Sequence, residues 1–257
     1  MAKQTFPLRL DAFTFEVKYA FGYTYLDRCG QVIVDAERNY DGWVPGSTSS
    51  LSGILENPGL AATVRFSADA FAFSATRVDD LSALAASAED LWGVVRLNLG
   101  LSEWVRIGCR FQYLLPKSSL GEVERTLMRA PLRVALYDET GRTIDWPEGY
   151  AATKQQPSIT LQREGVEYRV TLQSVTRIEG VSTSALVRTN PRLLPRNRRK
   201  AQLDAIKARQ SYARDPTYAL HLDIDCFVED PTDARAREFI LAQHECAKDL
   251  RFVVNGL

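Results

Sequence analysis

Apolar and polar residues alternate most regularly near the C-terminus, over residues 220–228. Apolar side chains occupy every second position, and His221, Asp223 and Asp225 occupy three of the positions between them. Successive side chains of a β-strand point to opposite faces of a sheet. The segment is therefore predicted to be a strand with one apolar face and one face that carries an imidazole and two carboxylates.

Weaker forms of this pattern predict further strands along the chain. They cover residues 13–21, 31–35, 63–66, 70–75, 103–115, 132–137, 159–163 and 167–173. A turn at 27–30 would join the first two, and Glu164-Gly165 between the last two is typical of a tight β-hairpin.

Helical spacing of apolar residues is clearest over residues 79–100, where Asp79 or Asp80 can cap the first turn and Gly100 can end the helix. A capping box at Ser119 predicts a short helix that Pro131 ends, and a terminal helix is predicted to begin near Pro231. These elements predict an α+β fold, mainly antiparallel sheet packed by about three helices. The 257 residues form a single unit, or two lobes, 1–130 and 131–257, with a basic connecting segment at 188–214.

Composition and charge indicate the cellular compartment in which the protein is expected to work. Lys and Arg number 32 and so do Asp and Glu, which gives no overall attraction to nucleic acid or to an anionic membrane. No apolar run is long enough to span a membrane, the first residues lack a signal-peptide pattern, and the four cysteines form no C-x-x-C pair. We therefore expect a cytoplasmic protein with no membrane attachment.

Residues 39–59 are rich in Gly, Pro and Ser and are predicted to form a long irregular loop. Long loops in compact domains are often functional, so Trp43 in this loop is a candidate partner contact. The alternative is that the aromatic residues of the loop fold back over an edge of the core.

The segment 188–214 carries nine basic residues and one acid, Asp204. Candidate partner contacts in it are Arg196, Arg198, Arg199 and Lys200, because guanidinium groups suit phosphate and carboxylate oxygens. Three interpretations remain open. The segment docks on the acidic C-terminal part of its own chain, binds a protein partner or a second copy, or grips a nucleic-acid backbone.

The polar face of the strand at 220–228 has two interpretations. Asp223 and Asp225, supported by His221, could hold Mg²⁺ or Mn²⁺, as paired carboxylates do in many phosphoryl-transfer sites. Alternatively, they pair across the sheet with Arg106 and Arg110, which have the same spacing. The sequence contains neither a phosphate-binding glycine-rich motif nor a G-x-S-x-G serine, and no catalytic residue is assigned.

Three segments together resemble a sporadically distributed family of uncharacterised bacterial proteins. They are an R-F-S-A-D-A-F-A-F run at 65–73 that leads into a helix with Leu91-Trp92, an R-x-G-x-R-F strand at 106–111, and an L-D-I-D strand at 222–225 before a terminal helix with His244-Glu245. The resemblance implies a bacterial, cytoplasmic α+β protein and implies no activity.

We therefore expect a non-enzymatic accessory or interaction protein without a cofactor, whose partner is a protein or a second copy, with nucleic acid as a further partner for the basic segment. A patchy family distribution would fit a mobile or anti-phage gene cassette. The alternative is a divalent-metal-dependent enzyme that acts on a phosphate-containing substrate, with Asp223 and Asp225 as ligands of Mg²⁺ or Mn²⁺.

Overall fold

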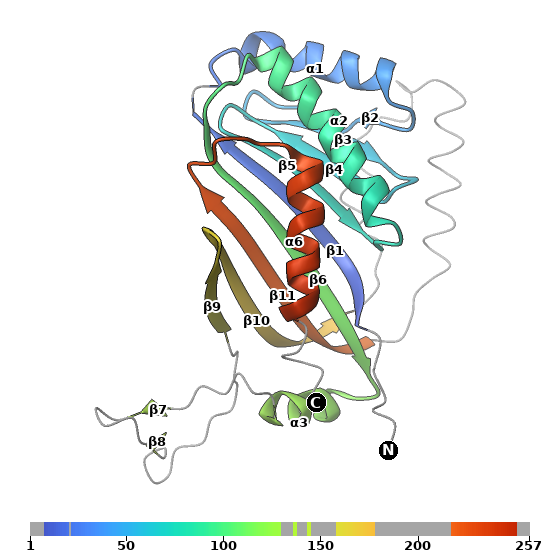
Figure 1. Ribbon diagram of the computed structural model, residues 1–257. Helices are drawn as coiled ribbons and strands as arrows, with labels where there is room; N and C mark the ends of the chain where they lie inside the picture. Colours follow the sequence, from blue (N-terminus) through green and yellow to red (C-terminus); the bar gives the residue numbers. More distant parts are fainter. Residues whose placement is uncertain are drawn as a thin grey trace.

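The computed structural model describes residues 8–20, 22–129, 136–137, 143–144, 158–177 and 217–250. Nine strands form one antiparallel sheet, and helices α2 and α6 lie across one side of it (Figure 1). The predicted α+β class and the predominance of antiparallel sheet are confirmed.

The longest strands lie at the centre of the sheet and the shortest at one edge. In spatial order the strands are β2 (Val44–Pro45), β3 (Gly53–Asn57), β4 (Ala62–Phe66), β5 (Ala70–Thr76), β1 (Arg9–Tyr19), β6 (Trp104–Lys117), β11 (Thr217–Glu229), β10 (Val166–Arg177) and β9 (Ser158–Arg163). A separate pair consists of β7 (Leu136–Tyr137) and β8 (Thr143–Ile144). Because β6 pairs with β11, strands from both sides of residue 130 join one sheet, and the two expected lobes would share it.

Four helices are present in the described residues: α1 (Tyr25–Asn39), α2 (Leu81–Leu99), α3 (Leu120–Arg129) and α6 (Ala236–Leu250). The caps of α2 are those that the sequence predicts. The Asp80 carboxylate accepts a hydrogen bond from the Ala83 N–H, and Gly100 ends the helix in a left-handed conformation. None of these helices has the length and hydropathy of a membrane span.

The strand predicted over 31–35, with a turn before it, is wrong, because these residues belong to α1. A strand would place Val32 and Val34 on one face, whereas Val32 is fully buried and Val34 is exposed. The buried residues of α1 are Tyr25, Val32 and Ala36, which recur at helical spacing and pack the helix against α2 and the edge of the sheet. Tertiary packing thus overrides the β-propensity of a short Val-Ile-Val run.

The long irregular loop predicted over 39–59 is corrected in part, because Asn39 ends α1 and residues 44–45 and 53–57 form β2 and β3. Trp43 is only 4% exposed and packs on Phe73, with ring centroids 5.9 Å apart. Gly53 in β3 faces the Phe66 ring so closely that a Cβ would lie 2.3 Å from it, which requires glycine. The alternative that the aromatic residue covers the core is therefore confirmed for Trp43.

The main core lies between the sheet and the helices. Phe13, Phe15, Phe71 and Phe111 project into it from the central strands and are fully buried. Trp92 of α2 stacks on the aromatic rings of the sheet, and its indole N–H donates to the Ala234 carbonyl, 2.8 Å away, at the entry to α6. We call this side of the sheet the covered face. The polar residues that alternate with these aromatic residues form the opposite side.

Candidate functional site

Polar side chains of four adjacent strands, β1, β6, β11 and β10, meet on the side of the sheet opposite the covered face. The strand register places Thr14, Arg110, Asp225 and Arg169 in one cross-strand row. The charged face, as we call it, consists of Glu16, Arg106, Arg110, Arg169, Asp223, Asp225 and Phe227. A hollow of about 450 Å³ opens over Gly108 at its centre, lined mostly by these charged side chains with Thr14 and Thr171.

Arg110 and Asp223 form the tightest ion pair of the charged face. The Arg110 Nε lies 2.8 and 3.0 Å from the two carboxylate oxygens, and one terminal nitrogen also donates to Oδ2. The Asp223 side chain is 10% exposed, so this pair compensates a nearly buried carboxylate. The hydrogen bond to Asp223 raises the pKa of the Arg110 guanidinium. Both oxygens of Asp223 are thus engaged by Arg110.

Arg106 is held differently. Its guanidinium carbon lies 4.0 Å from the centroid of the Phe227 ring, and Arg169 lies 4.7 Å from the same centroid. Two guanidinium groups therefore pack on one phenyl ring, an arrangement that cation–π attraction stabilises. The nearest carboxylate oxygens to Arg106 belong to Asp225 and Glu229, at 3.7 and 3.8 Å, beyond hydrogen-bond length. The Arg106 side chain is 23% exposed, so this mostly buried guanidinium donates no hydrogen bond to a side chain among the described residues.

Asp225 lies between arginines but does not accept a hydrogen bond from them. Its register neighbours are Arg110 on β6 and Arg169 on β10, and its closest cation is Arg106. Burial raises the pKa of the Asp225 carboxyl, and the charges of Arg106 and Arg110 counteract that rise. The centre of the charged face thus holds a partly desolvated carboxylate beside a partly desolvated guanidinium.

The imidazole of His221 is directed to a different partner. Its Nδ1 lies 2.8 Å from the side-chain amide nitrogen of Gln173, the residue opposite it on β10. Burial lowers the pKa of His221 from its usual 6.5, which favours the neutral ring.

The predicted alternative to a metal site, cross-strand pairing of Asp223 and Asp225 with Arg106 and Arg110, is confirmed. The pairs run diagonally: Asp223 lies two residues from Asp225, the direct neighbour of Arg110, and Asp225 lies four residues from Glu229, the direct neighbour of Arg106.

The structure does not bring His221, Asp223 and Asp225 together around one point. In the described parts of the chain, no group of three or more His, Cys, Asp or Glu side chains is arranged to hold a metal ion. Within this trio, a cation would have to displace Arg110 to reach the Asp223 carboxylate. The other two carboxylates that line the hollow are Asp225 and Glu16.

The other predicted site residues do not join the charged face. Trp43 lies in the core, and Arg196, Arg198, Arg199 and Lys200 lie outside the described residues, as does the whole basic segment 188–214. The sequence reasoning missed Glu16, Arg169 and Phe227. Glu16 and Arg169 occupy polar positions of alternating strands, which is a usable signal, whereas Phe227 interrupts the polar positions of β11 and gives none.

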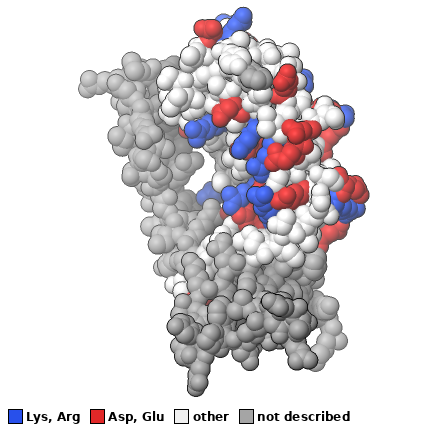
Figure 2. Space-filling view, turned by 90° about the vertical axis from the view of Figure 1, so that its left-hand side faces the viewer, with Lys and Arg blue, Asp and Glu red and all other residues white. Residues whose placement is uncertain are grey.

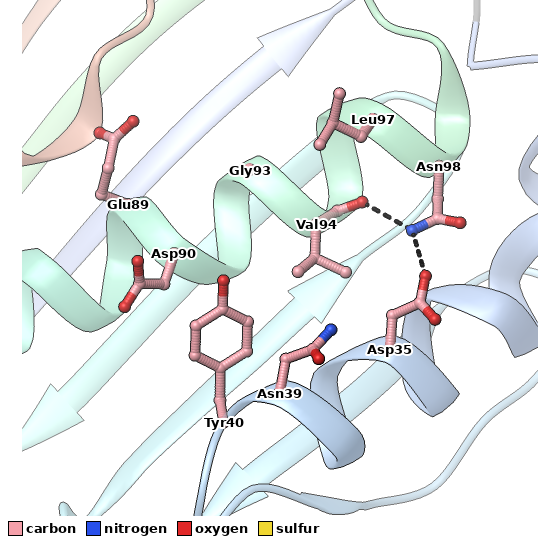
Figure 3. Close-up of a pocket in the computed structure, with 9 residues that line it drawn as sticks. All are labelled: Asp35, Asn39, Tyr40, Glu89, Asp90, Gly93, Val94, Leu97 and Asn98. Atoms are coloured by element: carbon pink, nitrogen blue, oxygen red, sulfur yellow. Dashed lines mark hydrogen bonds between the residues drawn. The ribbon is translucent and has the colours of Figure 1, made fainter.

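A second hollow, of about 500 Å³, lies between α1 and α2 (Figure 3). Its acidic residues are Asp35, Glu89 and Asp90. The Asn98 amide donates to Asp35 and to the Val94 carbonyl, both at 3.0 Å, and Glu89 accepts from the Arg237 backbone N–H. These contacts fasten α2 to α1 and to the start of α6, so we assign this hollow a structural role.

The sequence matches no protein-family model and no curated protein. The resemblance to a family of bacterial proteins therefore stays a prediction.

Proposed function

We propose that this protein is a non-enzymatic interaction protein and that the charged face is its binding surface. The observation that carries the proposal is the state of Arg106. Its guanidinium is oriented by Phe227 and is mostly removed from water, and in the part of the chain that the structure describes it has no hydrogen-bonded side-chain partner, although Asp225 is only 3.7 Å away. Removing polar groups from water without compensating hydrogen bonds is unfavourable, and a partner that supplies such bonds gains that free energy on binding.

Binding is favoured over catalysis because two of the three candidate acid–base or metal-binding residues on this strand, Asp223 and His221, are engaged in the fold. Arg110 holds the Asp223 carboxylate, and the Gln173 amide holds the His221 ring. Metal-dependent chemistry at Asp223 and Asp225 would first require Arg110 to leave. We therefore do not carry the metal-dependent enzyme forward as a second candidate.

The charge balance of the face favours a protein partner over nucleic acid. Three arginines and three carboxylates line the hollow, which gives no excess of positive charge. Nucleic-acid backbones are bound by such an excess, whereas protein surfaces with mixed charges match a mixed face. On the side of the molecule where β9 lies, Figure 2 likewise shows Lys and Arg side chains intermixed with Asp and Glu.

Charge reversal at Arg169 tests the proposal, with Arg163 as the matched control. Both side chains are half exposed, at 53% and 60%, and each makes surface ion pairs. Arg163 pairs in register with the core residue Val166 and contacts Asp249 of α6, so it lies on the covered side of the sheet. Arg169→Glu changes the charged face and Arg163→Glu does not.

Affinity capture from nuclease-treated bacterial lysate compares wild type with the two variants. The proposal expects a bound protein that Arg169→Glu loses and Arg163→Glu retains. Equal capture by both variants would place the binding surface elsewhere on the molecule.

A further inference from the structure

The charged face is complementary to itself. It has equal numbers of guanidinium and carboxylate groups around the hollow. Three of these groups, Arg106, Asp225 and Glu16, form no side-chain hydrogen bond with another described residue, and of these Arg106 and Asp225 are of opposite charge and lie side by side. A two-fold axis brings the same patch of two copies together so that residue i of one meets residue j of the other, and the reverse. Such an operation converts an internal charge pair into two intermolecular pairs.

We infer that the charged face binds a second copy of this chain about a two-fold axis that runs through the interface between Arg106 and Asp225. Each Arg106 then meets the partner's Asp225. This inference rests on the proposed function, because it names the partner of the surface proposed there.

The favourable free energy of dimerisation would come from hydrogen bonds that the described residues of a single copy do not form. Arg106 can donate two parallel N–H groups to a facing carboxylate, the strongest common side-chain pairing, without leaving the Phe227 ring. Asp225 accepts in return, which repays the partial desolvation that raises its pKa. Arg110 stays on Asp223, so the fold of each copy is unchanged.

The surface is large enough for this partner. The four strands that carry the charged face, β1, β6, β11 and β10, are 11 to 14 residues long. At a strand separation of about 4.8 Å, their surface covers on the order of 700 Å² per copy. A specific protein interface of standard size buries about 800 Å² on each partner. Side chains around the hollow are polar, as in interfaces between chains that also fold as separate monomers.

A charge-swap experiment tests the inference on the full chain by sedimentation velocity. In Arg106→Glu the new Glu faces the partner's Asp225, and in Asp225→Arg the new Arg faces the partner's Arg106. Each variant alone is therefore expected to be monomeric where the wild type is dimeric, with at least a tenfold weaker dimer. An equimolar mixture of the two variants restores both opposite-charge pairs and is expected to form the heterodimer.

Control variants distinguish loss of the contact between the two copies from unfolding of the variant. Arg163→Glu, on the covered side, should dimerise as the wild type does. If a charge-reversal variant loses its circular dichroism spectrum, Arg106→Gln replaces it and should still weaken the dimer. Recovery in the mixture cannot come from a purely structural role of either residue.

Two results would overturn the inference. One is a wild type that is monomeric throughout the micromolar range, and the other is a dimer that the charge changes at Arg106 and Asp225 leave unaffected. A monomer from which Arg169→Glu still removes a captured protein would leave the proposed function standing and replace the second copy with a different partner. A monomer that captures nothing would contradict both.

Discussion

The two sides of the central sheet are built from alternating residues of the same strands and differ in what their side chains do. On the covered face Phe13, Phe15 and Phe111 are fully buried and pack against helices. On the charged face their neighbours Thr14, Glu16 and Arg110 surround a hollow. Stability should thus depend mainly on the covered face and binding on the charged face, so changes on the two sides should have separable effects.

The largest expected effect comes from Trp92→Ala on the covered face. Trp92 is fully buried, packs on three aromatic rings and donates a hydrogen bond to Ala234, so its loss creates a large cavity. We expect the free energy of unfolding, measured by urea denaturation, to fall by about 3–5 kcal/mol. Leu97→Ala on the same helix, where the side chain is 77% exposed, should change it by less than about 0.5 kcal/mol. Similar losses for both would show that α2 does not pack as described.

Arg110→Gln should have the next largest effect, although it lies on the charged face. It leaves the Asp223 carboxylate without the arginine that compensates its burial. Because half of the Arg110 side chain is exposed, we expect a cost of about 2 kcal/mol rather than that of a fully buried pair. Adding Asp223→Asn removes the uncompensated charge and should recover most of the loss. No recovery in the double variant would mean that Arg110 acts through packing instead.

The free energy of unfolding should depend on pH because of His221. Its folded pKa lies below the unfolded value of 6.5, so the unfolded chain binds more protons and stability rises with pH through this window. The contribution is fully present above pH 6.5 and is lost as the pH falls towards the lowered pKa. His221→Gln should show a flatter stability profile than wild type between pH 7 and 5. Parallel profiles would contradict the burial of a neutral imidazole.

The smallest expected change in stability is that of Arg169→Gln. Arg169 is half exposed and its ion pair with Glu167 is a surface pair, so we expect the free energy of unfolding to change by less than about 0.5 kcal/mol. The same variant should weaken binding, because it removes one of the guanidinium groups around the hollow. A change that lowers stability as much as binding would remove the distinction between the two sides of the sheet.

The local pattern of apolar, polar and capping residues was enough to predict the helices and strands that depend mainly on their own sequence. Within the strand at 217–229, apolar and polar residues alternate from Leu220 to Cys226, and Asp80 and Gly100 determine the caps of α2. The hairpin at Glu164-Gly165 forms as predicted, with both residues at positive φ as a tight primed turn requires. Helix α1 was missed because whether this segment forms a helix or a strand depends on what Val32 and Ala36 pack against.

The charged face could be predicted only in part. The spacing of Arg106 and Arg110 matches that of Asp223 and Asp225, which suggested the cross-strand pairs. The strand order that places β10 beside β11, and hence Arg169 over Phe227, is not contained in any local pattern. The register places Arg110 opposite Asp225 and Arg106 opposite Glu229, so neither of the observed pairs, Arg110–Asp223 and Arg106–Asp225, joins direct neighbours, and the register itself follows from the assembled sheet.

Site-specific photo-crosslinking compares the two sides of the sheet most directly. A benzoylphenylalanine replaces Thr171, which lines the hollow, or Ala242, which is exposed on α6. On irradiation of the protein with its captured partner or a second copy, we predict a crosslinked product from position 171 and none from position 242. A product from position 242 alone would show that binding takes place on the helical side and would contradict the assignment of the charged face.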